Sequence, residues 1–278
     1  MPSLHPVVGG VLAGVVAATA LRLLRGSPPG GAESWDRTNH AGGTVTLLEG
    51  PAYAAGAACA AGFAGAGPGP VLAAAAAAGL GAVDDLVGDS SSKGFKGHLG
   101  ALARGEVTTG AVKILGLGLT GLASAALVDG ASRRAGRVAA GDTPTFVDTL
   151  VGAGVVAGSA NLLNLLDLRP GRALKVTLLW GALAGTRAPS AAAGAAAAGA
   201  AVGLLRPDLA GTAMLGDTGA NSAGALLGSA LVQSTGRRGR LVSLAVLSAL
   251  TLASEKVSFT KVIESTPVLR DLDALGRR

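Results

Sequence analysis

PVLAAAAAAGLGAVDD, residues 70–85, is an apolar run of small side chains that ends in two adjacent carboxylates. Ala and Gly are favoured where helices pack closely in lipid, whereas the cores of soluble proteins are filled by larger apolar side chains. Asp84 and Asp85 would be costly near the bilayer centre, so we expect them at a membrane interface. The stretch therefore predicts a membrane-spanning helix that ends in a polar site.

The same composition extends along the whole chain, which is 49% hydrophobic but only 3% aromatic and contains 45 glycines among 278 residues. A spanning helix needs about 17 to 25 mostly apolar residues. We expect nine spans, of which the third and seventh are the weakest, near residues 5–24, 51–67, 69–83, 107–128, 145–163, 173–187, 189–205, 219–235 and 240–256. A soluble alanine-rich protein is the alternative, but it does not explain why nine segments almost lack charged residues.

The predicted fold is an all-α transmembrane bundle of nine to ten spans, with residues 1–278 as one integral membrane domain and 257–278 as a C-terminal tail. With nine spans, fifteen of the 23 Lys and Arg residues and fourteen of the 17 Asp and Glu residues lie on the same face as the C-terminus. The positive-inside rule places this face in the cytoplasm, and hence the N-terminus outside the cell membrane.

The outer face is expected to carry little function. Its acidic residues are Asp129, Asp142 and Asp148, and we expect replacement of Asp129 or Asp148 to be nearly silent. The basic run at 237–240 lies on this face too, which favours contact with lipid headgroups over binding of nucleic acid.

Three groups of polar residues carry candidate chemistry. Asp84 and Asp85, followed by Lys93, Lys96 and His98, are suited to a hard cation such as Mg²⁺, with a solvated helix end as the alternative.

Asn161, Asn164 and Asp167 recur every three residues at the end of the fifth span, so they lie roughly on one helix face. Polar residues of this kind normally line a bundle interior or a cavity, and hydrogen bonding between helices is the alternative. The turn that follows, with Arg169 and Arg172, offers two cations to phosphate.

MLGDTGANS, residues 214–222, is a Gly-rich turn at the start of the eighth span. Such a turn presents backbone N–H groups to an anion, and Asp217 supplies a further metal ligand. Capping of a helix N-terminus is the simpler alternative.

In this order the three groups resemble the polyprenyl-phosphate N-acetylhexosamine-1-phosphate transferase family, which includes phospho-MurNAc-pentapeptide translocase. The resemblance also covers WDRTNH (35–40), KGFKGH (93–98) and TTGAVK (108–113). It implies a helical bundle of about ten spans with a cytoplasmic cleft, where Mg²⁺ bridges the diphosphate of a UDP-sugar. Polyprenyl phosphate attacks the sugar-linked phosphorus, and UMP leaves.

The resemblance also assigns residues. Asp84 and Asp85 would activate the lipid phosphate, with Asp85 and above all Asp217 as ligands of Mg²⁺ or Mn²⁺, and Lys113 would neutralise phosphate charge. The implied substrate-binding residues are Arg37, Asn39, Lys93, His98, Asn161, Asn164, Asp167 and Arg169. The oligomeric state is open, and a homodimer is compatible with the sequence.

The chain departs from the family where Pro170 stands at the usual second acidic position and where the last cytoplasmic loop lacks a His-rich motif. We therefore do not expect a MurNAc-pentapeptide substrate. Two alternatives remain: a catalytically silent relative that binds lipid phosphate or nucleotide sugar, and a transporter that uses intramembrane carboxylates. The carboxylates gather at span ends on one face, which favours an enzyme cleft over a transport path.

Overall fold

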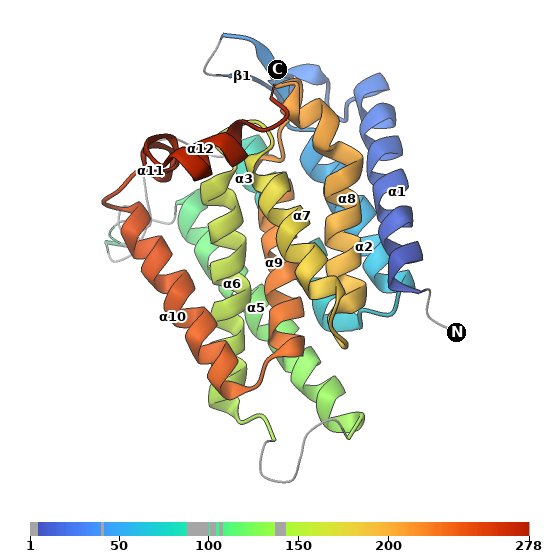
Figure 1. Ribbon diagram of the computed structural model, residues 1–278, viewed down its shortest axis with the longest axis vertical. Helices are drawn as coiled ribbons and strands as arrows, with labels where there is room; N and C mark the ends of the chain where they lie inside the picture. Colours follow the sequence, from blue (N-terminus) through green and yellow to red (C-terminus); the bar gives the residue numbers. More distant parts are fainter. Residues whose placement is uncertain are drawn as a thin grey trace.

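The computed structural model describes residues 5–39, 42–87, 100, 104–105, 108–136 and 143–277, and these form a bundle of long helices (Figure 1). The helices are α1 (Pro6–Gly26), α2 (Glu49–Phe63), α3 (Pro68–Val87), α5 (Thr109–Arg134), α6 (Phe146–Leu166), α7 (Arg172–Gly185), α8 (Ala191–Leu209), α9 (Gly216–Ser234), α10 (Arg237–Ser254), α11 (Phe259–Ser265) and α12 (Pro267–Ala274). The all-α fold is confirmed.

Each of the nine predicted apolar segments overlaps one helix among α1 to α3 and α5 to α10. Four of the described helices, α1, α3, α5 and α6, are long and apolar enough to cross a membrane, which is compatible with an integral membrane protein. The pair α10 and α11 also qualifies when it is counted as one span bent by 92°. The third segment, expected to be weak, is a full helix of 20 residues, whereas α2 and α7 have only 15 and 14.

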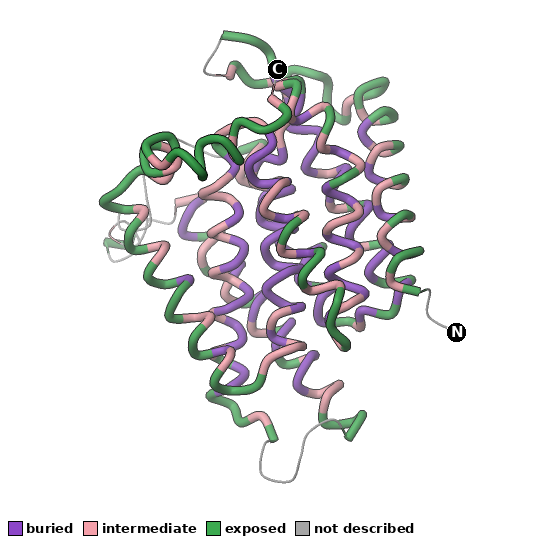
Figure 2. Tube along the Cα trace, in the orientation of Figure 1, coloured by how far each residue is buried: buried purple, intermediate pink, exposed green. Residues whose placement is uncertain are grey.

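Small side chains fill most of the interior, and many large apolar side chains lie outside. The core is dominated by alanines, while many valines and leucines are exposed. Figure 2 shows exposed residues along the outer helices and buried residues along the central ones. Val11 and Val15 on α1, Leu119 on α5 and Val242 on α10 are examples of the exposed group. In a water-soluble protein the large apolar side chains would be buried. Their exposure here fits helices whose outer surface contacts lipid.

The central helix is α9, in which nearly every residue is buried, and α3 and α6 pack along it. Glycines permit the closest of these contacts. A Cβ at Gly81 of α3 would collide with the backbone of Asp217 and Thr218 at the start of α9. The close approach of α3 and α9 therefore depends on a missing side chain, and it brings the ends of both helices together.

A short antiparallel hairpin, which the sequence did not predict, follows α1 and η1 (Ala32–Ser34). Its strands are β1 (Asp36–Thr38) and β2 (Thr44–Thr46), with Arg37 paired to Val45. The β2 strand also contacts the segment before α9, since Met214 donates a backbone hydrogen bond to Thr46. The hairpin is thereby held over the same end of the bundle as the start of α9.

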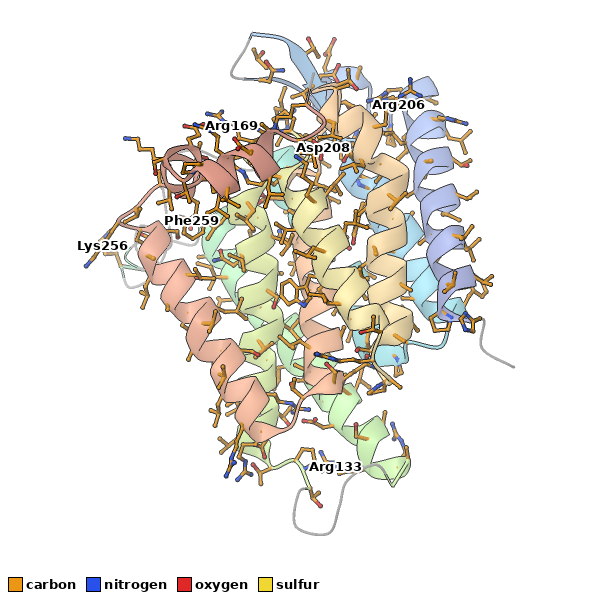
Figure 3. The ribbon with its side chains drawn as sticks, in the orientation of Figure 1. Arg133, Arg169, Arg206, Asp208, Lys256 and Phe259 are labelled. Atoms are coloured by element: carbon orange, nitrogen blue, oxygen red, sulfur yellow. The ribbon has the colours of Figure 1, made fainter. Side chains whose placement is uncertain are left out.

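The two ends of the bundle carry different polar groups. Figure 3 shows Arg169, Arg206 and Asp208 at one end and Arg133 at the opposite end. The start of α1 lies toward the end with Arg133, and the C-terminus lies at the end with Arg169, Arg206 and Asp208 (Figure 1). We call the end with Asp84, Arg169 and Asp208 the site end.

The opposite end is held by two ion pairs, which leads us to revise two expectations. Asp129 is fully buried and accepts hydrogen bonds from Arg240 and Thr149, both at 2.7 Å. The Arg237 side chain is 60% exposed and donates to both carboxylate oxygens of Asp148, at 2.6 and 2.7 Å. Arg237 and Arg240 therefore form ion pairs between helices instead of the predicted contacts with lipid headgroups. We no longer expect replacement of Asp129 to be silent, because it would leave the buried Arg240 without its partner.

Candidate functional site

Three carboxylates meet at the site end where α3 reaches the N-terminus of α9. They are Asp84, Asp85 and Asp217, and we call them the carboxylate cluster. Asp84 and Asp85 come from the last turn of α3, and Asp217 from the first turn of α9. The sequence predicted that these residues, 132 positions apart for Asp85 and Asp217, serve one site, and the structure brings them together.

Asp85 caps α9. Its Oδ1 accepts from the backbone N–H of Asp217 at 3.0 Å, and its Oδ2 accepts from the N–H and hydroxyl of Thr218 at 2.9 and 2.6 Å. A carboxylate at a helix N-terminus satisfies unpaired N–H groups and interacts favourably with the helix dipole. We therefore revise the role given to Asp85: it positions Asp217 and does not present a free carboxylate.

Asp84 and Asp217 are linked through Lys113 of α5. The Lys113 ammonium forms ion pairs with both carboxylates, at 3.3 Å to Asp84 and in close contact with Asp217. The other oxygen of Asp217 accepts from the amide of Asn164 at 2.7 Å. All three charged side chains keep about a fifth of their surface exposed, so they are accessible to a ligand.

Asp167 follows the last turn of α6 and points to the start of α9. Its Oδ2 accepts from the backbone N–H of Gly216 at 2.8 Å. Gly216 has φ +58°, a left-handed conformation that glycine adopts without strain. Burial raises the pKa of Asp167 well above its ordinary value, and the neighbouring Asp208 carboxylate adds to the effect.

Asn161 has a structural contact. Its amide donates to the Thr251 hydroxyl of α10 at 3.1 Å, which is the helix-to-helix hydrogen bond that the sequence left open as the alternative. Asn161 nevertheless lines a cavity, described below.

A cavity of about 380 Å³, with several charged and polar lining residues, lies under the hairpin next to the segment that precedes α9. We call it the polar pocket; its lining includes Arg37, Asn39, Asp167, Arg169 and Asp208. Arg37 also donates to the Asp85 carbonyl, so the hairpin is tied to the end of α3. The predicted residues Arg37, Asn39, Asp167 and Arg169, from three distant parts of the sequence, thus share one pocket.

A second cavity of about 360 Å³ lies between α5, α6 and the end of α10 and reaches the cluster at Asp84. We call it the helix pocket. Its polar lining residues include Asp84, Lys113, Asn161, Asn164 and Glu255, and its apolar ones include Ile114, Leu117 and Leu165. The cluster thus contributes Asp84 to the helix pocket, while Arg37, which donates to the Asp85 carbonyl, lines the polar pocket.

Two buried carboxyl groups near the polar pocket were not predicted from the sequence. Glu49, at the first residue of α2, is fully buried, and its oxygens lack a donor among the described residues. Asp208, which lines the pocket, is 1% exposed and accepts from the backbone N–H of Gly171 at 2.8 Å. Both residues stand at the ends of apolar runs, where a sequence pattern does not distinguish a buried carboxyl group from a solvated one.

The donor set can be compared with what Mg²⁺ needs. The described residues contain no group of three or more His, Cys, Asp or Glu side chains arranged to enclose a metal ion. Mg²⁺ usually binds through one or two carboxylates, with substrate phosphates and water completing its shell. Asp84 and Asp217, close together and partly exposed, fit that requirement. The predicted residues Lys93 and His98 lie outside the described residues.

Comparison of the sequence with protein-family models and with curated proteins gives no match. The family resemblance of the motifs therefore stays a prediction.

Proposed function

We propose that the chain is an integral membrane transferase that moves a sugar-1-phosphate from a UDP-N-acetylhexosamine to a polyprenyl phosphate and releases UMP. The observation that carries this proposal is the presence of two pockets at the site end, one under the hairpin with two arginines and one between the outer helices α5, α6 and α10 that reaches Asp84 of the carboxylate cluster. A reaction between a water-soluble donor and a lipid acceptor needs such a pair of sites.

The polar pocket is assigned to the UDP-sugar. Arg37 and Arg169 supply guanidinium groups, which suit the oxygens of a diphosphate. Asn39 and Asp167 offer hydrogen-bonding groups to the rest of the donor. Lys93 and His98 are retained as substrate-binding residues on the resemblance alone.

The helix pocket is assigned to the head of polyprenyl phosphate. Its wall of Ile114, Leu117 and Leu165 suits the first prenyl units, and Lys113 suits the phosphate. The reactive group of such a lipid lies in the headgroup layer. A site at the ends of α3, α5 and α9 is therefore at the depth that the acceptor requires.

The chemistry is phosphoryl transfer, where positioning and neutralisation of charge supply most of the rate. Mg²⁺ held by Asp84 and Asp217 together with phosphate oxygens would neutralise the diphosphate charge. Asp84 takes any remaining proton from the lipid phosphate, whose oxygen then bonds to the sugar-linked phosphorus. The bond from that phosphorus to the UMP oxygen breaks, and Lys113 stabilises the charge on the phosphates.

The membrane placement in this proposal treats the nine apolar helices as spans of the cell membrane, with the site end in the cytoplasm. A helix of 14 residues such as α7 is about 21 Å long, which is less than the roughly 30 Å of the hydrocarbon core. Local thinning of the bilayer accommodates short helices of this kind.

A silent relative that only binds lipid phosphate or nucleotide sugar is the second candidate. It is favoured by Pro170, which lines the polar pocket where the related enzymes carry an acidic residue.

Purified protein with polyprenyl phosphate, Mg²⁺ and a panel of UDP-sugars distinguishes the candidates by mass spectrometry of the lipid products. We expect a lipid-linked pyrophosphoryl sugar from at least one donor. Binding of polyprenyl phosphate with no product from any donor would favour the silent relative.

A further inference from the structure

The last two helices leave the direction of the bundle. The chain turns by 92° between α10 and α11, so that α11 and α12 lie across the site end next to α6 and α7 (Figure 1). With 7 and 8 residues, neither helix is long enough to cross a membrane.

One side of α12 is fixed to the first turn of α7. Asp273 forms two hydrogen bonds with the Arg172 guanidinium, at 2.8 and 2.9 Å, and its backbone carbonyl accepts from Lys175 at 2.7 Å. Arg277 donates to the Pro170 carbonyl at 2.8 Å. The helix is therefore held at a defined depth along α7, against the wall of the polar pocket.

A second side of α12 is apolar and uncovered. Val268 and Leu272 are 69% and 58% exposed and lie at i and i+4, which places them on one helix face. Leu269 extends this face, and Leu275, which is 67% exposed, follows the end of the helix. Arg270 lies on the opposite side, and the 71% exposed side chain of Asp271 lies at the border of the face. Leucine and valine at these exposures indicate a surface that is covered in the working protein.

We propose that α11 and α12 form an interfacial element, whose apolar face docks into the leaflet on the site end of the bundle. Exposed apolar side chains also occur on α10, at Val246 and Leu252, and between α10 and α12, at Val257 and Val262. A chain that leaves a lipid-facing helix and turns by 92° runs in the membrane plane. Interfacial helices of this kind bury their apolar side about 5 to 10 Å below the headgroups.

The docking depends on the membrane placement in the proposed function but not on the transferase chemistry. We had expected residues 257–278 to form a tail in the cytoplasm. In this proposal they instead form a segment bound to the lipid surface. Through Asp273 and Arg277 the same segment supports the loop of Arg169 and Pro170.

Spin-label accessibility tests the docking in the full chain. The single cysteine is removed by Cys59→Ala, and nitroxide labels are attached to Leu272→Cys, Asp271→Cys and Leu119→Cys in separate proteins. Each protein is reconstituted in phosphatidylcholine and phosphatidylglycerol vesicles, and collision with oxygen is compared with collision with a water-soluble nickel complex. All three positions have exposed side chains, so the labels are expected to leave the fold intact.

We expect the Leu272→Cys label to collide several-fold more with oxygen relative to nickel than the Asp271→Cys label, and the Leu119→Cys label to lie deepest. A nickel-accessible Leu272→Cys label beside a lipid-buried Leu119→Cys label would overturn the docking and leave the membrane placement intact. A Leu272→Cys label reached by neither reagent would also overturn it, since protein, such as a second copy of the chain, would then cover the face. A water-exposed Leu119→Cys label would instead refute the membrane placement.

Discussion

At the scale of single residues, the three carboxylates of the cluster have different roles. Asp217 and Asp84 present partly exposed oxygens, whereas the oxygens of Asp85 hold the first turn of α9. We expect Asp217→Asn to lower turnover by about 100-fold or more with an unchanged thermal midpoint, because loss of a charge-stabilising group at the reacting centre costs this much. Asp85→Asn should lower both the turnover and the thermal midpoint, because Thr218 loses its charged partner.

These effects are measured as UMP release and thermal unfolding in detergent, with the exposed Asp271→Asn as the control. Equal loss of stability in Asp217→Asn and Asp85→Asn would contradict the division of roles.

The ion pair at the opposite end gives a prediction about stability alone. Asp129→Asn leaves the Arg240 guanidinium buried beside a neutral amide. Removal of one partner of a buried pair costs roughly 3 to 5 kcal/mol. We expect the free energy of unfolding to fall by this order, while the turnover of the remaining folded protein stays near that of wild type. An Asp129→Asn variant as stable as the control Asp271→Asn would show that Asp129 does not contribute to stability.

At the scale of helices, the contact of α3 with α9 sets the position of the whole cluster. Gly81 and Gly79 form a matched pair on α3: a Cβ at Gly81 would meet the backbone of Asp217, while a Cβ at Gly79 meets nothing within 4 Å. Gly81→Ala should separate the helices, lowering both the thermal midpoint and turnover. Gly79→Ala should keep both, or gain slightly in stability from the better helix propensity of alanine. Similar behaviour of the two variants would show that the close approach of α3 and α9 is not required.

The same contact explains how far the sequence could predict the structure. Apolar runs between charged loops were enough to find nine helices, because burial of backbone polar groups in lipid permits few other structures. The apolar runs did not settle the number of spans, because α2 and α7 are short helices. They also did not predict the hairpin, because strands of three residues are too short to show a periodic pattern. Tertiary contacts also decided the roles of Asp85, Asn161 and Asp129, which depend on partners far away in the sequence.

At the scale of the whole molecule, the interior is filled mostly by small residues, many large apolar residues lie outside, and most of the described acidic residues lie at one end. The polar pocket and the helix pocket both lie at that end, and Asp84 lines the second of them. This arrangement fits the proposed reaction, in which one substrate comes from water and the other from the bilayer, and neither has to cross the membrane.

The identity of the released nucleotide tests this account most directly. Purified protein in vesicles is given polyprenyl phosphate, Mg²⁺ and the UDP-N-acetylhexosamine it accepts, and the nucleotide and lipid products are separated and weighed by mass spectrometry. The account predicts UMP in equal amount to a lipid-linked pyrophosphoryl sugar, lost on chelation with EDTA and restored by Mg²⁺ or Mn²⁺. Release of UDP, with the sugar transferred without its phosphate, would contradict it.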